Sequence, residues 1–230
     1  MNWKTAHKIS DVAFSFGSGW EAKVLGLFSA LKARKKELSS MDRALLLELL
    51  QQELDKIAIA EKEALDNATQ LAYNYSLEAT LEEYADVITI PSLGLGYNKR
   101  WFRDKKSYEE RIHANIAGIK SELQGLIIGW QGDDPIILMG LIYDIIQKAE
   151  NEWIRLIRTE LEAAYSQGVR DAYLEKGCLY AVIENDSPCE EICAEMVGEH
   201  PVPLNGALGL DLPPYHPYCK CVFLGIFGHR

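Results

Sequence analysis

Apolar residues recur at helical spacing along most of the chain, beginning shortly after residue 40. Ser39-Ser40-Met41-Asp42 is an N-capping signal, because a serine oxygen and a carboxylate can both accept hydrogen bonds from free amides. An apolar stripe follows at intervals of four, four and three residues: Leu46, Leu50, Leu54 and Ile57. That spacing lies on one helical face, and no Gly or Pro interrupts residues 40–90. The pattern therefore predicts one long helix, or two joined ones.

Two further helices are predicted downstream. Ser107 and Glu110 form a second capping box. The apolar stripe after it consists of Ile112, Ile116, Ile119, Leu123 and Leu126. Gly129-Trp130-Gln131-Gly132 then breaks the helical pattern. Asp134-Pro135 restarts it, because it combines a capping carboxylate with a first-turn proline.

The pattern changes where this third helix is expected to end, at Lys176 with Gly177 as its C-terminal cap. Leu179-Tyr180-Ala181-Val182-Ile183 has strand character, and all five cysteines lie in the last 53 residues. A segment this short and irregular needs packing against the helices or a staple such as a metal. We therefore predict a mainly α protein with a small C-terminal α+β cysteine-rich module, its long helices packed on a short sheet.

The charge of the chain is uneven. A net charge of −10 argues against a protein whose main task is to coat nucleic acid. Residues 1–40 nevertheless hold seven basic and three acidic side chains, and residues 98–106 hold five and one. The two basic islands are Lys32-Ala33-Arg34-Lys35-Lys36 and the segment around Trp101. They indicate local contacts with a negative partner, or they are ordinary solvated surfaces. The candidate contact set is Lys99, Arg100, Trp101, Arg103, Lys105 and Lys106.

The expected compartment follows from two sequence features. No stretch of about 18 apolar residues predicts a transmembrane helix, so no membrane partner is expected. The start, Met-Asn-Trp-Lys-Thr-Ala-His-Lys, is not followed by the apolar core of a secretory signal. We therefore expect folding in the cytosol, where thiols stay reduced. A cysteine cluster there more often indicates a metal or a catalytic thiol than disulfides.

Cysteines and one histidine form two local groups near the C-terminus. Cys189-Glu190-Glu191-Ile192-Cys193 separates one pair by a helical turn, and His216-Pro217-Tyr218-Cys219-Lys220-Cys221 follows after 22 residues. Zinc prefers four such ligands in a tetrahedron. A closed structural site would use three cysteines and one alternative fourth ligand: Cys189, Cys193, Cys219 and either His216 or Cys221. Simple buried thiols, with the histidine holding a loop, are one alternative, and a disulfide formed in a finished particle is another.

The same residues allow a catalytic interpretation, which needs a base beside a cysteine or a metal with an open position. His216 lies near Cys219 in the sequence and provides such a base. The chain has no nucleophile elbow, no His-Glu-x-x-His, no phosphate loop and no dinucleotide fingerprint. We therefore expect no enzyme activity, and a small metal-dependent hydrolase or nuclease is the rival interpretation.

Charged residues cluster within the third predicted helix, at Arg155-Leu156-Ile157-Arg158-Thr159-Glu160. Arg158 and Glu160 are two residues apart and do not face each other, whereas Arg158 and Glu162 can pair along the helix. These side chains are solvated charges, or they join the helix to the cysteine-rich module. Gly168 costs about 1 kcal/mol relative to alanine in a helix, so it marks a close contact or a kink.

Several of these motifs occur in the same order as in a known family. The segments are Trp101, Ser107–Ile112, Trp153–Glu160, Tyr165–Gly168, Asp186–Cys189, Cys193, Gly198 and Pro214–Cys221. In this order they resemble the Mu F-like family of phage minor head proteins, whose Arg-Thr-Glu helix precedes a strand and a cysteine-rich ending. The resemblance covers about residues 97–221. Lys220 replaces the family's usual arginine, and the first cysteine pair has three intervening residues where the family often has two.

The resemblance implies a minor capsid protein that acts in head morphogenesis, in the virion and, during assembly, in the host cytoplasm. The expected partners are phage portal or capsid proteins, with DNA bound weakly and without sequence preference. We divide the chain into an N-terminal helical region, 1–96, and a head-morphogenesis domain, 97–230, with helices in 107–176 and the module in 178–230. Structural zinc is the expected cofactor. The expected joint between helix and module consists of Arg158, Thr159, Glu160 and Asp186.

Overall fold

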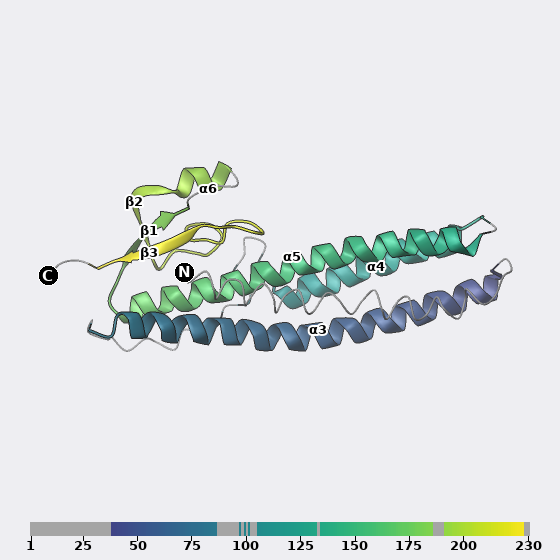
Figure 1. The fold of residues 1–230 in the computed structure, drawn as a ribbon, viewed down its shortest axis with the longest axis horizontal. Helices are drawn as coiled ribbons and strands as arrows, with labels where there is room; N and C mark the ends of the chain where they lie inside the picture. Colours follow the sequence, from purple (N-terminus) through teal and green to yellow (C-terminus); the bar gives the residue numbers. More distant parts are fainter. Residues whose placement is uncertain are drawn as a thin grey trace. The chain divides into compact units, whose positions relative to one another are not determined.

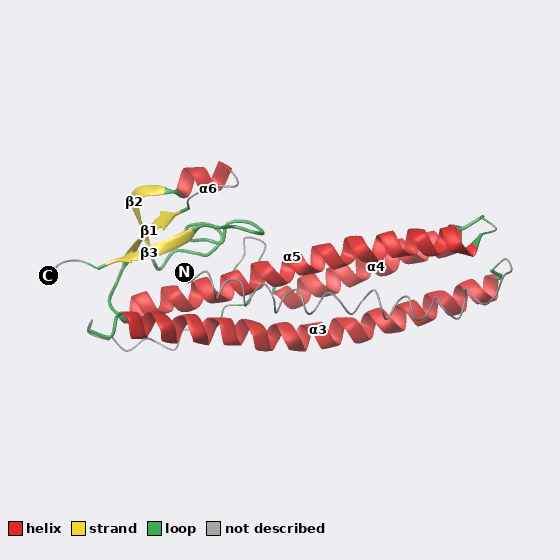
Figure 2. Ribbon diagram, in the orientation of Figure 1, coloured by secondary structure: helices red, strands yellow, loops and turns green. Residues whose placement is uncertain are grey.

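The computed structural model describes residues 38–86, 97, 99, 101, 105–132, 134–185 and 191–227. The elements are α3 (Ser40–Glu83), α4 (Tyr108–Gly129), α5 (Pro135–Glu175), β1 (Tyr180–Glu184), α6 (Glu191–Met196), β2 (Gly198–Pro203) and β3 (Val222–Ile226) (Figure 1). The protein is mainly helical with a small antiparallel sheet near its C-terminus, so the predicted fold class is confirmed (Figure 2).

The described residues fall into two compact units. Residues 38–64 and 109–154 form a helical unit, and residues 65–108 and 155–227 belong to a mixed unit that contains the sheet. The helices α3 and α5 each contribute residues to both units.

Local signals set where the helices begin. The Asp42 amide donates a hydrogen bond to Ser39 Oγ, and the Ser39 amide donates one to the Asp42 carboxylate, both at 3.1 Å. This reciprocal pair is a capping box, and α3 begins beside it as predicted. At the start of α5 the Ile136 amide donates to the Asp134 carboxylate at 2.8 Å. A single helix, α3, covers most of residues 40–90.

A glycine ends α5, as the sequence predicts. Gly177 has a φ of 75°, in the left-handed region that glycine adopts without steric cost. The amides of Gly177 and Cys178 donate to the carbonyls of Leu174 and Tyr173, both at 2.9 Å. This Schellman motif satisfies the last carbonyls of α5 and turns the chain toward β1.

Each helix of the helical unit buries one apolar stripe. The predicted α3 stripe is buried throughout, and in α4 Ile127 is fully buried while the predicted Leu126 is only half-buried. The α5 stripe consists of Leu138, Ile142, Ile146, Ala149 and Trp153. Ion pairs between Lys120 and Asp55 (2.6 Å) and between Lys62 and Glu109 (3.0 Å) connect α3 with α4 at the surface. Core and surface contacts thus place these helices against one another.

Within the mixed unit, α3 and α5 approach closely at Gly168. A Cβ atom on Gly168 would lie 2.0 Å from Ser76 Oγ and 2.4 Å from the Tyr73 carbonyl oxygen. One turn away, the Tyr73 hydroxyl donates to the buried Asp171 carboxylate at 2.7 Å. Of the two possibilities that the sequence left open at Gly168, the structure shows the close contact.

We expect Gly168→Ala to lower the free energy of unfolding by about 1–3 kcal/mol, because the methyl group overlaps the facing turn of α3. The matched control is Gly118→Ala in α4, where nothing lies within 4 Å of an added Cβ. That change should raise the free energy of unfolding by about 0.5–1 kcal/mol, since alanine favours the helix. Urea denaturation followed by circular dichroism measures both. Equal effects would show that the helices do not meet at Gly168.

The sheet has the strand order β2-β1-β3, and both pairs are antiparallel. Ile183 of β1 is opposite Phe223 of β3, and both side chains are buried. The Phe223 ring meets the Tyr173 ring of α5 edge-on, with centroids 6.3 Å apart. On the other face Tyr180 and Leu224 are exposed. One sheet face therefore packs against the C-terminal end of α5.

Candidate metal centre

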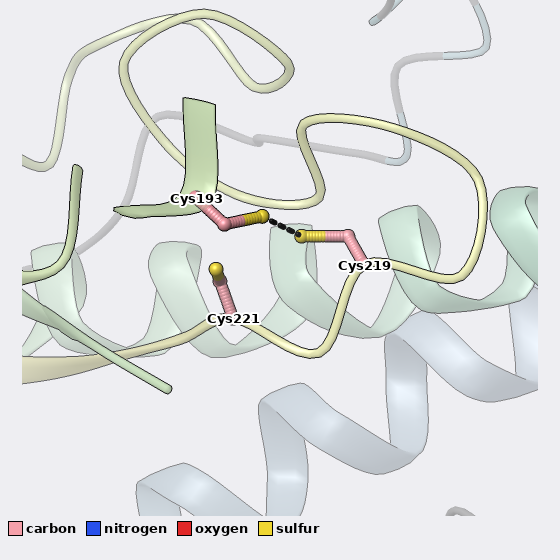
Figure 3. A group of neighbouring side chains, drawn as sticks. All are labelled: Cys193, Cys219 and Cys221. Carbon is pink, nitrogen blue, oxygen red and sulfur yellow. Dashed lines mark hydrogen bonds between the residues drawn. The ribbon is translucent and has the colours of Figure 1, made fainter. Parts of the chain in front are cut away.

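Three cysteine thiols converge in the mixed unit, with their sulfur atoms pointing toward one another (Figure 3). The Sγ atoms of Cys193, Cys219 and Cys221 all lie within 4.8 Å of one another, and those of Cys193 and Cys219 are 3.9 Å apart. Zinc–sulfur bonds of about 2.3 Å in a tetrahedron place sulfur atoms about 3.8 Å apart. The three side chains are 0%, 7% and 7% exposed. Their spacing and burial suit a metal ion.

Two different elements supply these thiols. Cys193 is the buried residue of the short helix α6. Cys219 follows a turn in which its amide donates to the His216 carbonyl at 3.2 Å, and Cys221 directly precedes β3. Pro217 and Tyr218 lie inside this turn, and the φ of Tyr218 is 61°. A proline followed by a left-handed residue is typical of a type II turn, which here brings the second cysteine pair back toward α6.

The His216 ring directs one nitrogen toward the thiols and the other toward the backbone. Its Nε2 lies 2.9 Å from Cys193 Sγ, and its Nδ1 lies 2.8 Å from the Pro217 carbonyl oxygen. Because a carbonyl only accepts hydrogen bonds, we assign the ring proton to Nδ1, which leaves the Nε2 lone pair facing Cys193. Histidines that bind metals usually have their tautomer fixed in this way. The side chain is buried, with 7% exposed.

Cys219 and Cys221 are electrostatically coupled. The pKa of Cys219 is lowered to about 5, chiefly because the Cys221 thiol donates a hydrogen bond to it. The same hydrogen bond, together with burial, raises the pKa of Cys221. The Asn185 side chain donates to Cys221 Sγ at 3.2 Å. The hydrogen bond from Cys221 therefore favours the thiolate form of Cys219, which is the form that binds metals.

The structure brings three of the five predicted metal ligands into one cluster, Cys193, Cys219 and Cys221, and it places a fourth, His216, with its Nε2 2.9 Å from Cys193 Sγ. Cys189 lies outside the described residues, as does Asp186 of the predicted joint. The remaining cysteine, Cys178, contacts the carbonyl oxygens of Tyr180 and Ile226 instead, at 3.2 and 3.1 Å. All four described cysteines have free thiols.

Glu160, from the predicted joint, is fully buried. Its carboxylate accepts hydrogen bonds from Trp101 Nε1 at 2.9 Å and from the Tyr97 hydroxyl at 2.7 Å. Trp101 belongs to the same apolar cluster as residues of the module, including Leu204 and Tyr215. Glu160 is therefore joined to the module through Trp101, which itself lies outside the module. No local sequence pattern predicts these hydrogen bonds, because they join residues 59 and 63 positions apart.

The other residues predicted for the joint and for the contact set differ in their surroundings. Thr159 Oγ1 donates to the Arg155 carbonyl within α5 at 2.8 Å. Trp101 is only 3% exposed, so it belongs to the core and not to a contact surface. Lys99 forms an ion pair with Asp66. Two members of the contact set, Lys105 and Lys106, are exposed. The remaining predicted contacts lie outside the described residues: Arg100, Arg103 and 32–36.

Glu162 is a site residue whose position sequence reasoning missed, although it was noted as a helical partner of Arg158. Its Oε2 is buried and has no hydrogen-bond partner among the described residues. The pKa of Glu162 is raised to about 8, chiefly by burial and secondly by the nearby Cys219, while Arg158 acts in the opposite direction. The Arg158 guanidinium lies over the Tyr218 ring, 5.7 Å from its centroid. Both side chains therefore face the turn that carries Cys219.

Compared with protein-family models, curated proteins and solved structures, the chain has no match. Among the described helices, none has the length and apolar character that crossing a membrane requires. Support for a function therefore comes from the motifs and from the geometry of the thiol cluster.

Proposed function

We propose that the protein is a phage minor head protein of the Mu F-like kind, whose cysteine-rich module is held together by a structural zinc ion. One observation carries the proposal: motif residues far apart in the sequence meet in the mixed unit. Trp101 donates to Glu160, and Cys193 of α6 lies beside Cys219. Motif residues that together define one structural module are expected to contact one another in the fold. In the assembly role we propose, the partners are portal or capsid proteins in the virion, with weak, non-specific DNA contact.

Burial favours a structural metal over a catalytic one. A catalytic zinc keeps one coordination position open to water and substrate. Here the candidate donors are three thiols and one imidazole, each with 7% or less of the side chain exposed. With zinc bound, the three thiols and the imidazole would make a closed four-ligand set. A bound zinc would link α6 to the turn before β3, and so stabilise a module that is too small to build a large core.

Protein purified under reducing conditions without chelator should carry about one zinc per chain by elemental analysis. His216→Ala should weaken zinc binding, because it removes the fourth ligand. Cys189→Ser tests the other predicted ligand, and Cys178→Ser is the matched control that should leave the metal content unchanged. Loss of metal in Cys189→Ser but not in His216→Ala would make Cys189 the fourth ligand. Parent protein without metal, with its thiols linked as disulfides or unreactive, would contradict the zinc site.

The assembly role is tested in particles of the source phage. The protein should be present in purified heads and in assembly intermediates, and chemical cross-linking should join it to portal or capsid subunits. Absence from both heads and intermediates would overturn the assembly role. Hydrolysis of nucleic acid that depends on Cys193 would instead favour a metal-dependent nuclease.

A further inference from the structure

Arg158 and Glu162 lie one helical turn apart on α5, near the turn that carries two of the proposed metal ligands. The Arg158 guanidinium carbon is 5.7 Å from the ring centroid of Tyr218, the residue next to Cys219. Arg158 Nε and Glu162 Oε2 are both buried, and neither has a hydrogen-bond partner among the described residues. The spacing would allow these two side chains to pair along the helix, yet the two atoms do not bond to each other.

Arg158 is half-buried, and its buried Nε calls for an explanation, because buried polar groups are normally hydrogen-bonded. The metal centre supplies one. Three thiolates and a neutral imidazole around a divalent zinc ion have a net charge of −1. This charge would lie among buried side chains, where a nearby cation stabilises it most strongly. The Arg158 guanidinium is held beside the same turn by its contact with Tyr218.

We propose that Arg158 is the counter-ion of the metal–thiolate centre. It binds no metal itself, but it stabilises the negative charge that three thiolates leave on the centre. Arg158 is thus a positioning residue that acts through Cys219 and its neighbours. The inference depends on the proposed zinc site, which it extends from the four ligands to the helix beneath them.

The test is the zinc affinity of the full chain, measured by competition with a chromophoric chelator. Arg158→Met keeps a long apolar side chain but removes the charge, and it should weaken zinc binding by about 10–100-fold, the usual effect of losing a partner of the ligands. Arg158→Lys keeps the charge and should lose less than Arg158→Met. The matched control is Arg155→Met, because Arg155 is an exposed arginine on the same helix. Its affinity should equal that of the parent.

A second measurement separates a charge effect from loss of packing. Cobalt(II) replaces zinc in tetrahedral thiolate sites and gives visible absorption bands that report the ligands. In Arg158→Met the bands should keep their positions while the cobalt affinity falls, since the ligands are unchanged. Equal losses in Arg158→Lys and Arg158→Met would overturn the charge role, and so would parent-like affinity in Arg158→Met. If the parent binds no metal, the zinc proposal itself fails, which is a distinguishable result.

Discussion

Removing zinc should unfold residues 178–227 while α3 and α4 remain helical. Structural zinc sites contribute an apparent binding free energy of about 10–16 kcal/mol, comparable to the entire stability of a typical domain. Three of the proposed ligands, Cys193, Cys219 and Cys221, are themselves members of the buried cluster that forms the module's core. If zinc is bound there, its loss would remove a crosslink between buried residues of the module's core.

Limited proteolysis with and without chelator measures this effect, with the fragments identified by mass spectrometry. Chelator should allow cleavage between Gly177 and Pro213 at protease concentrations that the zinc-bound protein resists. The helical signal in circular dichroism should fall only slightly, because the long helices lie outside the module. Cleavage that is the same with and without chelator would show that the module folds without metal.

Cys193→Ser should reproduce the effect of chelator, since it removes the ligand that α6 contributes. Cys178→Ser is the matched control, because Cys178 is equally buried but contacts two backbone carbonyls instead of the thiol cluster. A serine hydroxyl can keep one of those contacts, so we expect a loss of about 1 kcal/mol and a parent-like zinc content. Identical protease sensitivity of the two variants would argue that Cys193 acts by packing alone.

The helices could be predicted because their signals are local. The Ser39–Asp42 capping box and the α3 stripe require only residues within four positions of one another, and the structure has both. The same holds for Gly177, whose left-handed conformation ends α5. Where the prediction shifted, from Leu126 to Ile127, the two residues are neighbours at the edge of one helical face.

The candidate site could be predicted only as a set of residue types. Cysteine and histidine in two local groups indicate zinc, but their convergence depends on the left-handed Tyr218 and on where α6 places Cys193. No periodicity reports either feature. From the sequence Glu162 is an ordinary helical charge, because its neighbour Cys219 lies more than fifty residues further along the chain. The phage head assignment, which depends on the order of the motifs, stays a prediction.

Glu160→Ala should lower the free energy of unfolding by about 3 kcal/mol or more. The substitution takes the acceptor away from the Trp101 indole and the Tyr97 hydroxyl, and the indole is only 3% exposed. A buried donor without an acceptor destabilises the fold by its full desolvation free energy. The deleted side chain leaves a void as well. Glu152→Ala is the matched control, because Glu152 is exposed on the same helix. Its effect should stay within about 0.5 kcal/mol.

A double-mutant cycle assigns this loss to the bond between Glu160 and Trp101. Trp101→Phe keeps an aromatic ring in the apolar cluster but removes the N–H donor. If the carboxylate and the indole act together, Glu160→Ala should cost less in the Trp101→Phe protein than in the parent. The coupling free energy should be about 1–3 kcal/mol, the range measured for residues in direct contact.

Urea denaturation of the four proteins gives the coupling directly, and protease cleavage within residues 178–227 reports whether the module loosens first. Additive losses would show that the carboxylate does not bond to Trp101 in solution, and the cysteine-rich module would then have to be joined to α5 by other contacts.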